Sequence, residues 1–85
     1  MKFTIYSKDN CPHCSRAVLK LTQAKLPFEQ LKLNEDFNRE ELLKKFPQAK
    51  SYPQIEYDSG SRTLYIGGAD DLEKWLNRDI QPESN

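Results

Sequence analysis

Residues 8–16 of the chain have the sequence KDNCPHCSR and contain its only two cysteines, Cys11 and Cys14, in a C-x-x-C pair. The preceding segment, residues 3–6, is rich in β-branched and aromatic side chains and predicts a buried strand. After the first cysteine, Pro12 suits the first turn of a helix, and apolar residues recur at helical spacing from Cys14. The sequence therefore predicts a strand, a loop, Cys11 at the N-cap of a helix, and the helix itself.

This placement predicts a reactive thiol at Cys11. A thiolate at a helix N-terminus faces unpaired backbone N–H groups and a partial charge of about +0.5, so the helix end favours the anion and lowers the pKa of the thiol. Neighbouring Lys8 and His13, with Pro12 inside the motif, are candidates for further redox tuning. We expect Cys11 to be the exposed nucleophile and Cys14, one helical turn later, to be the shielded resolving thiol, so that the pair cycles between dithiol and disulfide.

Length and composition limit the class of protein. The 85 residues suit one small domain. Equal numbers of basic and acidic side chains, 13 of each, give a formal net charge of zero, which argues against general binding to nucleic acid or to a membrane surface. No apolar run approaches the ~18 residues of a membrane span, and the N-terminus lacks the apolar core of a signal peptide, so we expect a cytoplasmic protein. In a reducing compartment two cysteines are more often catalytic or metal-binding than a structural staple.

Proline, glycine and capping signals divide the chain into seven expected elements. The predicted helices cover residues 12–26, a segment opened by Asn34-Glu35-Asp36 and ended by Pro47, and a segment capped by Asp70 or Asp71; the predicted strands cover residues 3–6, 28–33, 51–57 and 62–66. A strand, a helix and a strand within about thirty residues predict a parallel pair. The turn at residues 58–61 predicts an antiparallel pair.

The resulting order is β-α-β-α-β-β-α, with the C-x-x-C pair between the first strand and the first helix. This order resembles the thioredoxin fold in its smallest form, an α/β fold with a four-stranded mixed sheet flanked by helices. Leu72, Trp75 and Leu76 recur at helical spacing and are expected to form the core face of the last helix. We expect one domain at residues 1–80 and a short flexible C-terminal tail at residues 81–85.

Three segments together resemble the landmarks of the glutaredoxin family, in order and in spacing. They are residues 5–8 before CPHC at 11–14, FPQAKSYPQI at 46–55, and IGGADDL at 66–72. The resemblance implies a glutathione-dependent thiol–disulfide oxidoreductase without a tightly bound cofactor, in which glutathione is the reductant and Cys11 attacks the substrate disulfide. It further implies a monomer that reduces protein disulfides and glutathione mixed disulfides, with ribonucleotide reductase as a family-level expectation for a protein substrate.

The resemblance also implies where glutathione would bind. Pro53 would follow a cis peptide bond, and the backbone of Tyr52 would pair with the cysteinyl part of the tripeptide. Asp70, at the start of the last helix, would receive the γ-glutamyl group, and Lys8 and Arg39 the glycyl carboxylate. The full set of expected glutathione-binding residues is Lys8, His13, Arg39, Tyr52, Pro53, Gly68, Ala69 and Asp70.

Two positions depart from the family pattern. His13 stands where glutaredoxins usually have tyrosine, and Tyr52 where they usually have valine. A partly cationic His13 would favour the thiolate and make the disulfide more oxidising; the alternative is an exposed residue at the helix start without a tuning role. For Tyr52 the alternatives are ordinary packing and a role in specificity. The alternative interpretation of Lys8 is a solvated charge in a loop, and that of Asp70 is a helix N-cap.

Other known uses of a C-x-x-C pair are disfavoured. A structural zinc site needs about four nitrogen or sulfur ligands, and the chain has one histidine and two cysteines, so we assign no metal ligand. A c-type haem needs histidine where Ser15 stands. Pro12 disfavours an iron–sulfur cluster shared between two subunits and glutathione, as some glutaredoxins have. Two interpretations stay open: a small thioredoxin-like carrier recharged by a reductase, although thioredoxins usually carry Gly-Pro between the cysteines, and a non-enzymatic peptide-binding module.

Overall fold

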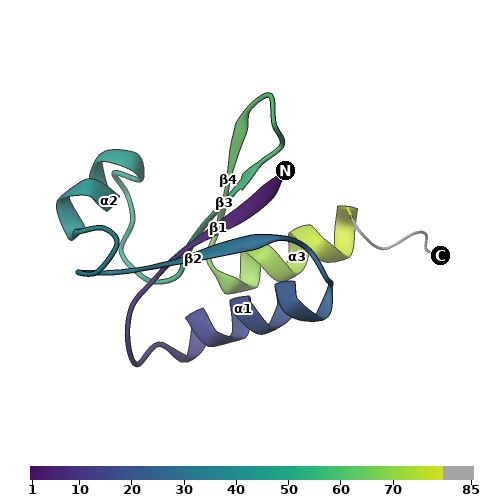
Figure 1. Ribbon diagram of the computed structural model, residues 1–85, viewed down its shortest axis with the longest axis horizontal. Helices are drawn as coiled ribbons and strands as arrows, with labels where there is room; N and C mark the ends of the chain where they lie inside the picture. The colour runs from purple at the N-terminus through teal and green to yellow at the C-terminus, as the bar shows by residue number, and fades with distance from the viewer. Residues whose placement is uncertain (80–85) are drawn as a thin grey trace.

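Seven elements of regular structure follow one another in the computed structural model, which describes residues 1–79. They are β1 Lys2–Ser7, α1 Pro12–Gln23, β2 Phe28–Lys32, α2 Arg39–Lys45, β3 Gln54–Asp58, β4 Thr63–Gly67 and α3 Ala69–Asp79. The order is the predicted β-α-β-α-β-β-α of a minimal thioredoxin fold (Figure 1). Residue 80 and the tail predicted at residues 81–85 lie outside the described residues, so the predicted division at residue 80 stays a prediction.

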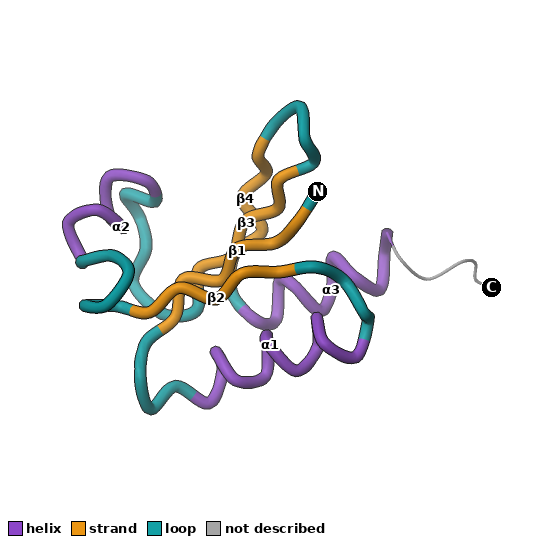
Figure 2. Tube along the Cα trace, in the orientation of Figure 1, coloured by secondary structure: helices purple, strands orange, loops and turns teal. Residues whose placement is uncertain are grey.

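The four strands of the described chain form one mixed sheet in the order β2-β1-β3-β4. β1 runs parallel to β2, with Phe3 opposite Phe28, and antiparallel to β3, with Ile5 opposite Ile55. β4 is antiparallel to β3 and forms one edge of the sheet, whereas β2 forms the other (Figure 2). The predicted parallel first pair and antiparallel last pair are both confirmed.

The main apolar core lies between the sheet and the helices α1 and α3, which lie side by side (Figure 1). Phe3 and Ile5 of β1 point into this core, because alternate side chains of a strand face the same side, and they are 2% and 0% exposed. From α3, Leu72 and Leu76 are buried, and Trp75 packs edge-on against Phe3 with ring centroids 5.4 Å apart. The predicted core face of α3 is thus confirmed.

A second, smaller cluster lies on the other face of the sheet, beside α2. Its buried members are Phe37, Leu42 and Phe46. Tyr6 of β1 packs edge-on against both phenylalanines, with centroid distances of 5.2 Å to Phe37 and 5.5 Å to Phe46. Since Tyr6 alternates with Phe3 and Ile5 along β1, the sheet separates this cluster from the main core.

All three helices differ from their predicted bounds. α1 ends before residue 26, because Lys25 adopts a left-handed backbone with a φ of 59°. The predicted cap of the second helix at Asn34 is wrong, because Asn34 lies in a turn with a φ of 70°. α2 is capped instead by Asn38, whose side chain accepts the N–H of Glu41 while the Glu41 side chain accepts the N–H of Asn38. This reciprocal capping box starts the helix later than predicted.

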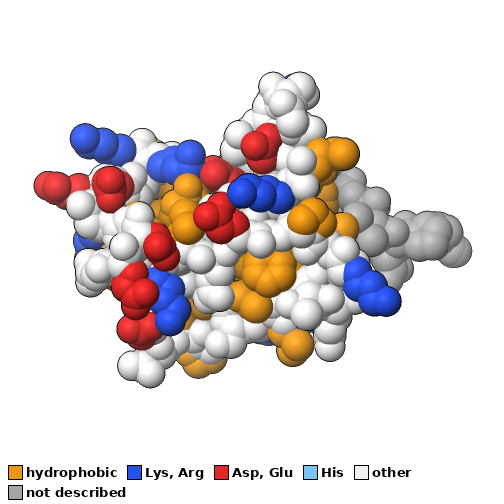
Figure 3. All heavy atoms as spheres, viewed as in Figure 1, with side chains coloured by type: hydrophobic (Ala, Val, Ile, Leu, Met, Phe, Trp, Pro, Cys, Tyr) orange, Lys and Arg blue, Asp and Glu red, His pale blue; other side chains and the backbone are white. Residues whose placement is uncertain are grey.

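The surface carries charges of both signs. On the face shown in Figure 3, acidic and basic side chains mix over α2 and the neighbouring strands, as expected of a chain with a formal net charge of zero. Among the described large hydrophobic side chains, Met1, Leu19 and Tyr65 are exposed. No helix within residues 1–79 combines the length and the hydropathy that crossing a bilayer requires.

Tyr6 leads to a prediction for alkaline pH. Burial, and secondarily the negative charge of Glu56, raise the pKa of Tyr6 to about 12. A tyrosine in the unfolded chain ionises near pH ~10, so the stability that neutral Tyr6 contributes is complete below that pH and is lost as the pH rises towards ~12. We expect the urea midpoint of wild type to fall more steeply over this range than that of Tyr6→Phe. Equal falls in the two proteins would contradict the prediction.

Candidate active site

The two cysteines lie at the start of α1, where the structure joins their sulfurs in a disulfide with the Cα atoms 5.2 Å apart. Cys11 is the N-cap residue, with extended backbone, as predicted. Its Sγ accepts a hydrogen bond from the backbone N–H of Cys14 at 3.2 Å. The sulfur of Cys11 therefore lies where helix N–H groups and the helix dipole stabilise negative charge once the disulfide is reduced.

The two sulfurs differ in access. Cys11 is partly exposed, whereas Cys14 is 2% exposed and belongs to the buried side of α1. A disulfide substrate can therefore approach Cys11, while Cys14 is shielded. This difference agrees with the expected roles of attacking and resolving thiol.

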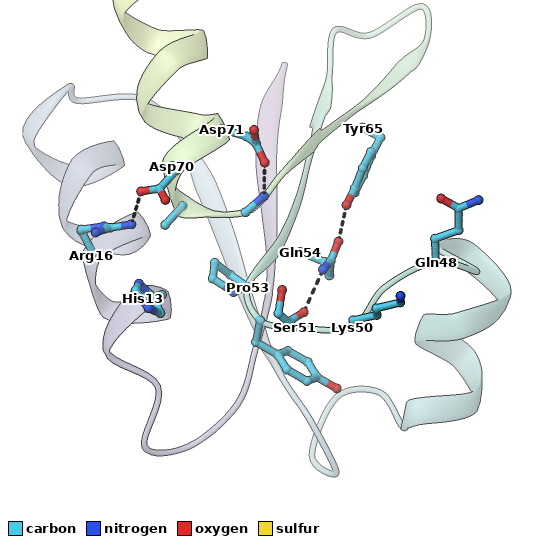
Figure 4. A pocket seen from close by; sticks show the side chains of 13 residues that line it. His13, Arg16, Gln48, Lys50, Ser51, Pro53, Gln54, Tyr65, Asp70 and Asp71 are labelled. Carbon is cyan, nitrogen blue, oxygen red and sulfur yellow. Dashed lines mark hydrogen bonds and ion pairs between the residues drawn. The ribbon is translucent and has the colours of Figure 1, made fainter.

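A cleft of about 460 Å³ lies between the start of α1, the loop before β3, and the junction of β4 and α3 (Figure 4). Of the cysteine motif, His13 lines the cleft, whereas Cys11 and Cys14 do not. Six of the eight expected glutathione-binding residues line it, namely His13, Tyr52, Pro53, Gly68, Ala69 and Asp70. Seven residues outside the expected set also line the cleft, namely Arg16, Gln48, Lys50, Ser51, Gln54, Tyr65 and Asp71. The cleft thus gathers residues from the three sequence landmarks.

The other two expected residues lie near this cleft but do not line it. The Lys8 Nζ is 5.4 Å from the centre of the Tyr52 ring, within the range of a cation–π contact. Arg39, at the start of α2, lines a neighbouring hollow of about 60 Å³ that Tyr52 also lines. Tyr52 therefore lines both the cleft and the hollow at Arg39, and its ring contacts Lys8.

A hydrogen-bonded chain supports the loop at Pro53. β3 begins at Gln54, later than the predicted residue 51, and the peptide bond between Tyr52 and Pro53 is cis, as the family resemblance implied. Gln54 is 4% exposed; its side-chain amide donates to the Ser51 carbonyl at 2.8 Å, and its side-chain oxygen accepts from the Tyr65 hydroxyl at 2.5 Å. The loop that lines the cleft is thereby connected to β4.

Tyr65 keeps its proton at neutral pH. Although most of the Tyr65 side chain is exposed, its hydroxyl is partly buried against Gln54, and this burial, with the negative charge of Asp71 as the smaller cause, raises the pKa of Tyr65. The hydroxyl therefore stays a donor to Gln54. Sequence reasoning missed this pair because its members lie on different strands; the hairpin turn at residues 58–61 is the one signal that brings them together.

The start of α3 corrects the predicted cap. Neither Asp70 nor Asp71 is the N-cap residue, because both lie in the first turn of a helix that begins at Ala69. The Asp71 carboxylate accepts the N–H of Gly68 at 3.1 Å, whereas Asp70 forms an ion pair with Arg16, Oδ1 to Nη2, at 2.6 Å. Asp70 is therefore available to the cleft rather than used as a cap.

Gly67 allows this arrangement. Its φ of 118° is left-handed, and a Cβ there would collide with the Asp71 side chain. The absence of a side chain at Gly67 therefore makes room for the Asp71 carboxylate next to the Gly68 N–H. In the described residues no group of three or more His, Cys, Asp or Glu side chains is placed to hold a metal ion.

Comparisons with known proteins agree with this geometry. Residues 3–60 match the family model described as glutaredoxin. The chain is 36% identical over 69 residues to glutaredoxin 3 of Escherichia coli K12, covering 80% of this chain and 77% of the relative. The solved structure of reduced Escherichia coli glutaredoxin is similar with a TM-score of 0.73 and 25% identity, covering 94% of this chain and 98% of that one. A buckwheat glutaredoxin–glutathione complex is similar with a TM-score of 0.70 and 23% identity, covering 92% and 69%.

Proposed function

The chain belongs to the glutaredoxin family, and we propose that it reduces disulfides with electrons taken from glutathione. Membership of this family and the close cysteine pair make it a thiol–disulfide oxidoreductase. One observation carries the proposal of glutathione as reductant: the partly exposed Cys11 lies at a helix N-terminus next to a cleft with a carboxylate and cations around it. The buckwheat relative, whose structure contains glutathione, supports it.

The charges around the cleft suit a small zwitterionic peptide. Glutathione has two carboxylates and one ammonium group, so its site needs cations, a helix N-terminus and one acid. Asp70 and the start of α3 are proposed to receive the γ-glutamyl end, and Lys8 and Arg39 the glycyl carboxylate. The backbone of Tyr52 is proposed to pair with the cysteinyl residue, as an added short strand would.

The proposed cycle transfers two electrons. The Cys11 thiolate attacks one sulfur of the substrate disulfide, forming a mixed disulfide and releasing the other sulfur as a thiolate. Cys14 attacks this mixed disulfide, frees the second substrate thiol and leaves the Cys11–Cys14 disulfide that the structure contains. A first glutathione then forms a mixed disulfide with Cys11, and a second removes it as glutathione disulfide. With glutathionylated substrates Cys11 alone suffices.

The proposal extends to protein substrates. We propose that proteins with accessible disulfides are reduced in addition to glutathione mixed disulfides, with ribonucleotide reductase as a family-level expectation. The proposed setting is the cytoplasm, where glutathione keeps thiols reduced, and the proposed active form is a monomer.

The choice of reductant tests the proposal. With NADPH, glutathione and glutathione reductase, wild type is expected to reduce a small disulfide at least about tenfold faster than with NADPH and thioredoxin reductase, because only glutathione matches the charges of the cleft. Reactions without the protein give the background rate. A faster rate with thioredoxin reductase would favour the thioredoxin-like carrier. Background rates with both reductants would favour the peptide-binding module.

His13 is proposed to tune the redox potential. It lies in the first turn of α1, exposed and at the cleft. An imidazole that carries a proton there would favour the thiolate and so the reduced form, and His13→Tyr is expected to lower the potential by about 30 mV, equivalent to a tenfold change in the equilibrium with glutathione. Redox equilibration of both proteins against glutathione measures this. An unchanged or higher potential in His13→Tyr would leave His13 without a tuning role.

A further inference from the structure

We propose that Arg16 binds the α-carboxylate of the γ-glutamyl group of glutathione, so that Arg16 and Asp70 together recognise the zwitterionic end of the tripeptide. This inference rests on the proposed function, which it deepens. Arg16 lies outside the C-x-x-C motif at residues 11–14 and outside the eight expected glutathione-binding residues.

Arg16 and Asp70 meet at one wall of the cleft. Arg16 lies on α1 one turn after His13, and Asp70 lies in the first turn of α3; the Arg16 Nη2 is 2.6 Å from the Asp70 Oδ1 (Figure 4). Both side chains line the cleft. They therefore present a guanidinium and a carboxylate side by side. The γ-glutamyl α-carbon of glutathione carries a carboxylate, which would pair with the guanidinium, and an ammonium group, which would pair with the carboxylate.

Within their ion pair, Arg16 retains N–H donors and Asp70 retains a carboxylate oxygen that can bind a ligand. A guanidinium has five N–H donors in a planar fork, and the ion pair engages Nη2. The Arg16 Nε is shielded from solvent and has no hydrogen-bond partner among the described residues, which is an unfavourable state for a donor. The Asp70 side chain is 80% exposed, so its second oxygen is accessible to an ammonium group.

The start of α3 adds to the attraction for a carboxylate at this wall. The first-turn N–H groups of a helix have no intrahelical acceptor, and they carry partial positive charge. The Asp71 carboxylate accepts the N–H of Gly68, which precedes the helix, and among the described residues no loop or cap hydrogen bond is donated by the N–H groups of Ala69 and Asp70. The full charge of Arg16 would make the contact with the same carboxylate charge-assisted.

A purely structural role for Arg16 can be separated from binding, because α1 and α3 share a second ion pair. Lys20, one turn later on α1, pairs with Glu73 at 3.0 Å, and its side chain is 37% exposed against 38% for Arg16. Lys20 does not line the cleft. Lys20→Gln therefore removes a matched contact between the same two helices and serves as the control variant.

The experiment measures the second-order rate constant for reduction of the Cys11–Cys14 disulfide, by trapping the protein thiols that appear. Wild type, Arg16→Gln and Lys20→Gln are each reduced by glutathione and by two analogues. In one analogue γ-aminobutyrate replaces γ-glutamate and removes the α-carboxylate; in the other, glutarate replaces it and removes the ammonium. Thermal unfolding of each oxidised variant checks that the fold is retained.

Arg16→Gln is expected to slow reduction by glutathione about tenfold and reduction by the aminobutyryl analogue little, so that the preference for the carboxylate falls about tenfold. It should retain discrimination against the glutaryl analogue. Lys20→Gln should retain both preferences, and Arg16→Lys, which keeps the charge without the fork, should restore part of the rate.

Other outcomes overturn the inference in distinguishable ways. Equal slowing of glutathione and the aminobutyryl analogue in Arg16→Gln would show that Arg16 does not contact the carboxylate. Loss of discrimination against the glutaryl analogue instead would show that Arg16 only orients Asp70. If wild type prefers glutathione and Arg16→Gln keeps every preference, the inference fails alone. If glutathione reduces wild type no faster than an uncharged thiol does, the proposed function fails as well.

Discussion

Cys11→Ser is expected to lower the rate of glutathione-coupled disulfide reduction by at least about a thousandfold, to the rate of uncatalysed exchange. The reason is that Cys11 is the accessible sulfur and the one that accepts the Cys14 N–H at the start of α1. A serine hydroxyl there stays protonated at neutral pH and cannot form a disulfide. The measurement is NADPH consumption with glutathione, glutathione reductase and a glutathionylated peptide. Equal rates for wild type and variant would contradict the enzymatic proposal.

Cys14→Ser is the matched control, since it removes the other sulfur and leaves the nucleophile. It is expected to retain reduction of the glutathionylated peptide and to lose reduction of a protein disulfide, because the adduct of Cys11 with a protein needs the second thiol for release. The buried position of Cys14 suits such an internal step. If both activities fell together in Cys14→Ser, the division of roles between the two cysteines would be wrong.

Phe3→Ala is expected to lower the free energy of unfolding by about 3–5 kcal/mol. Phe3 is 2% exposed, and its ring lies 4.8 Å from that of Tyr57 and 5.4 Å from that of Trp75. Domains are stable by about 5–15 kcal/mol, and a chain of this length falls towards the lower end, so the loss is a large part of the total. Urea unfolding of the oxidised protein, followed by circular dichroism, measures it.

The control for this substitution is Leu19→Ala on the exposed side of α1. Leu19 is 52% exposed, so its removal is expected to change the free energy of unfolding by less than about 0.5 kcal/mol. A loss at Phe3 no larger than the loss at Leu19 would mean that the aromatic packing of Phe3 adds little to stability.

The order of elements could be predicted because each has a local signal. Pro27 and Pro47 interrupt the helical patterns, and the turn at residues 58–61 joins two strands. The start of α2 could not, because Asn34 and Asn38 offer the same capping chemistry. The choice between them depends on the turn that Asn34 adopts and on Glu41, whose side chain completes the capping box with Asn38.

The candidate site also contains parts that the sequence indicates and parts that it does not. The cysteine pair and the segment around Pro53 are continuous stretches of sequence and could be recognised as such. The Arg16–Asp70 and Gln54–Tyr65 pairs join residues 54 and 11 positions apart, and only the folded sheet and helices bring them into contact. The family resemblance implies Asp70 as a site residue, but spacing in the sequence does not indicate its partner Arg16 on α1.

Because the sheet separates two apolar clusters of different size, the free energy of local opening differs between parts of the molecule. α2 has seven residues and covers the smaller cluster, whereas α1 and α3 bury the larger one. Amide hydrogen exchange in α2 should therefore proceed through local opening, at lower free energy than exchange in β1 or α1. Cleft residues 48 and 50–52 follow α2 directly in the chain, whereas the two cysteines lie at the start of α1, so local opening of α2 should disturb that wall of the cleft more than the disulfide.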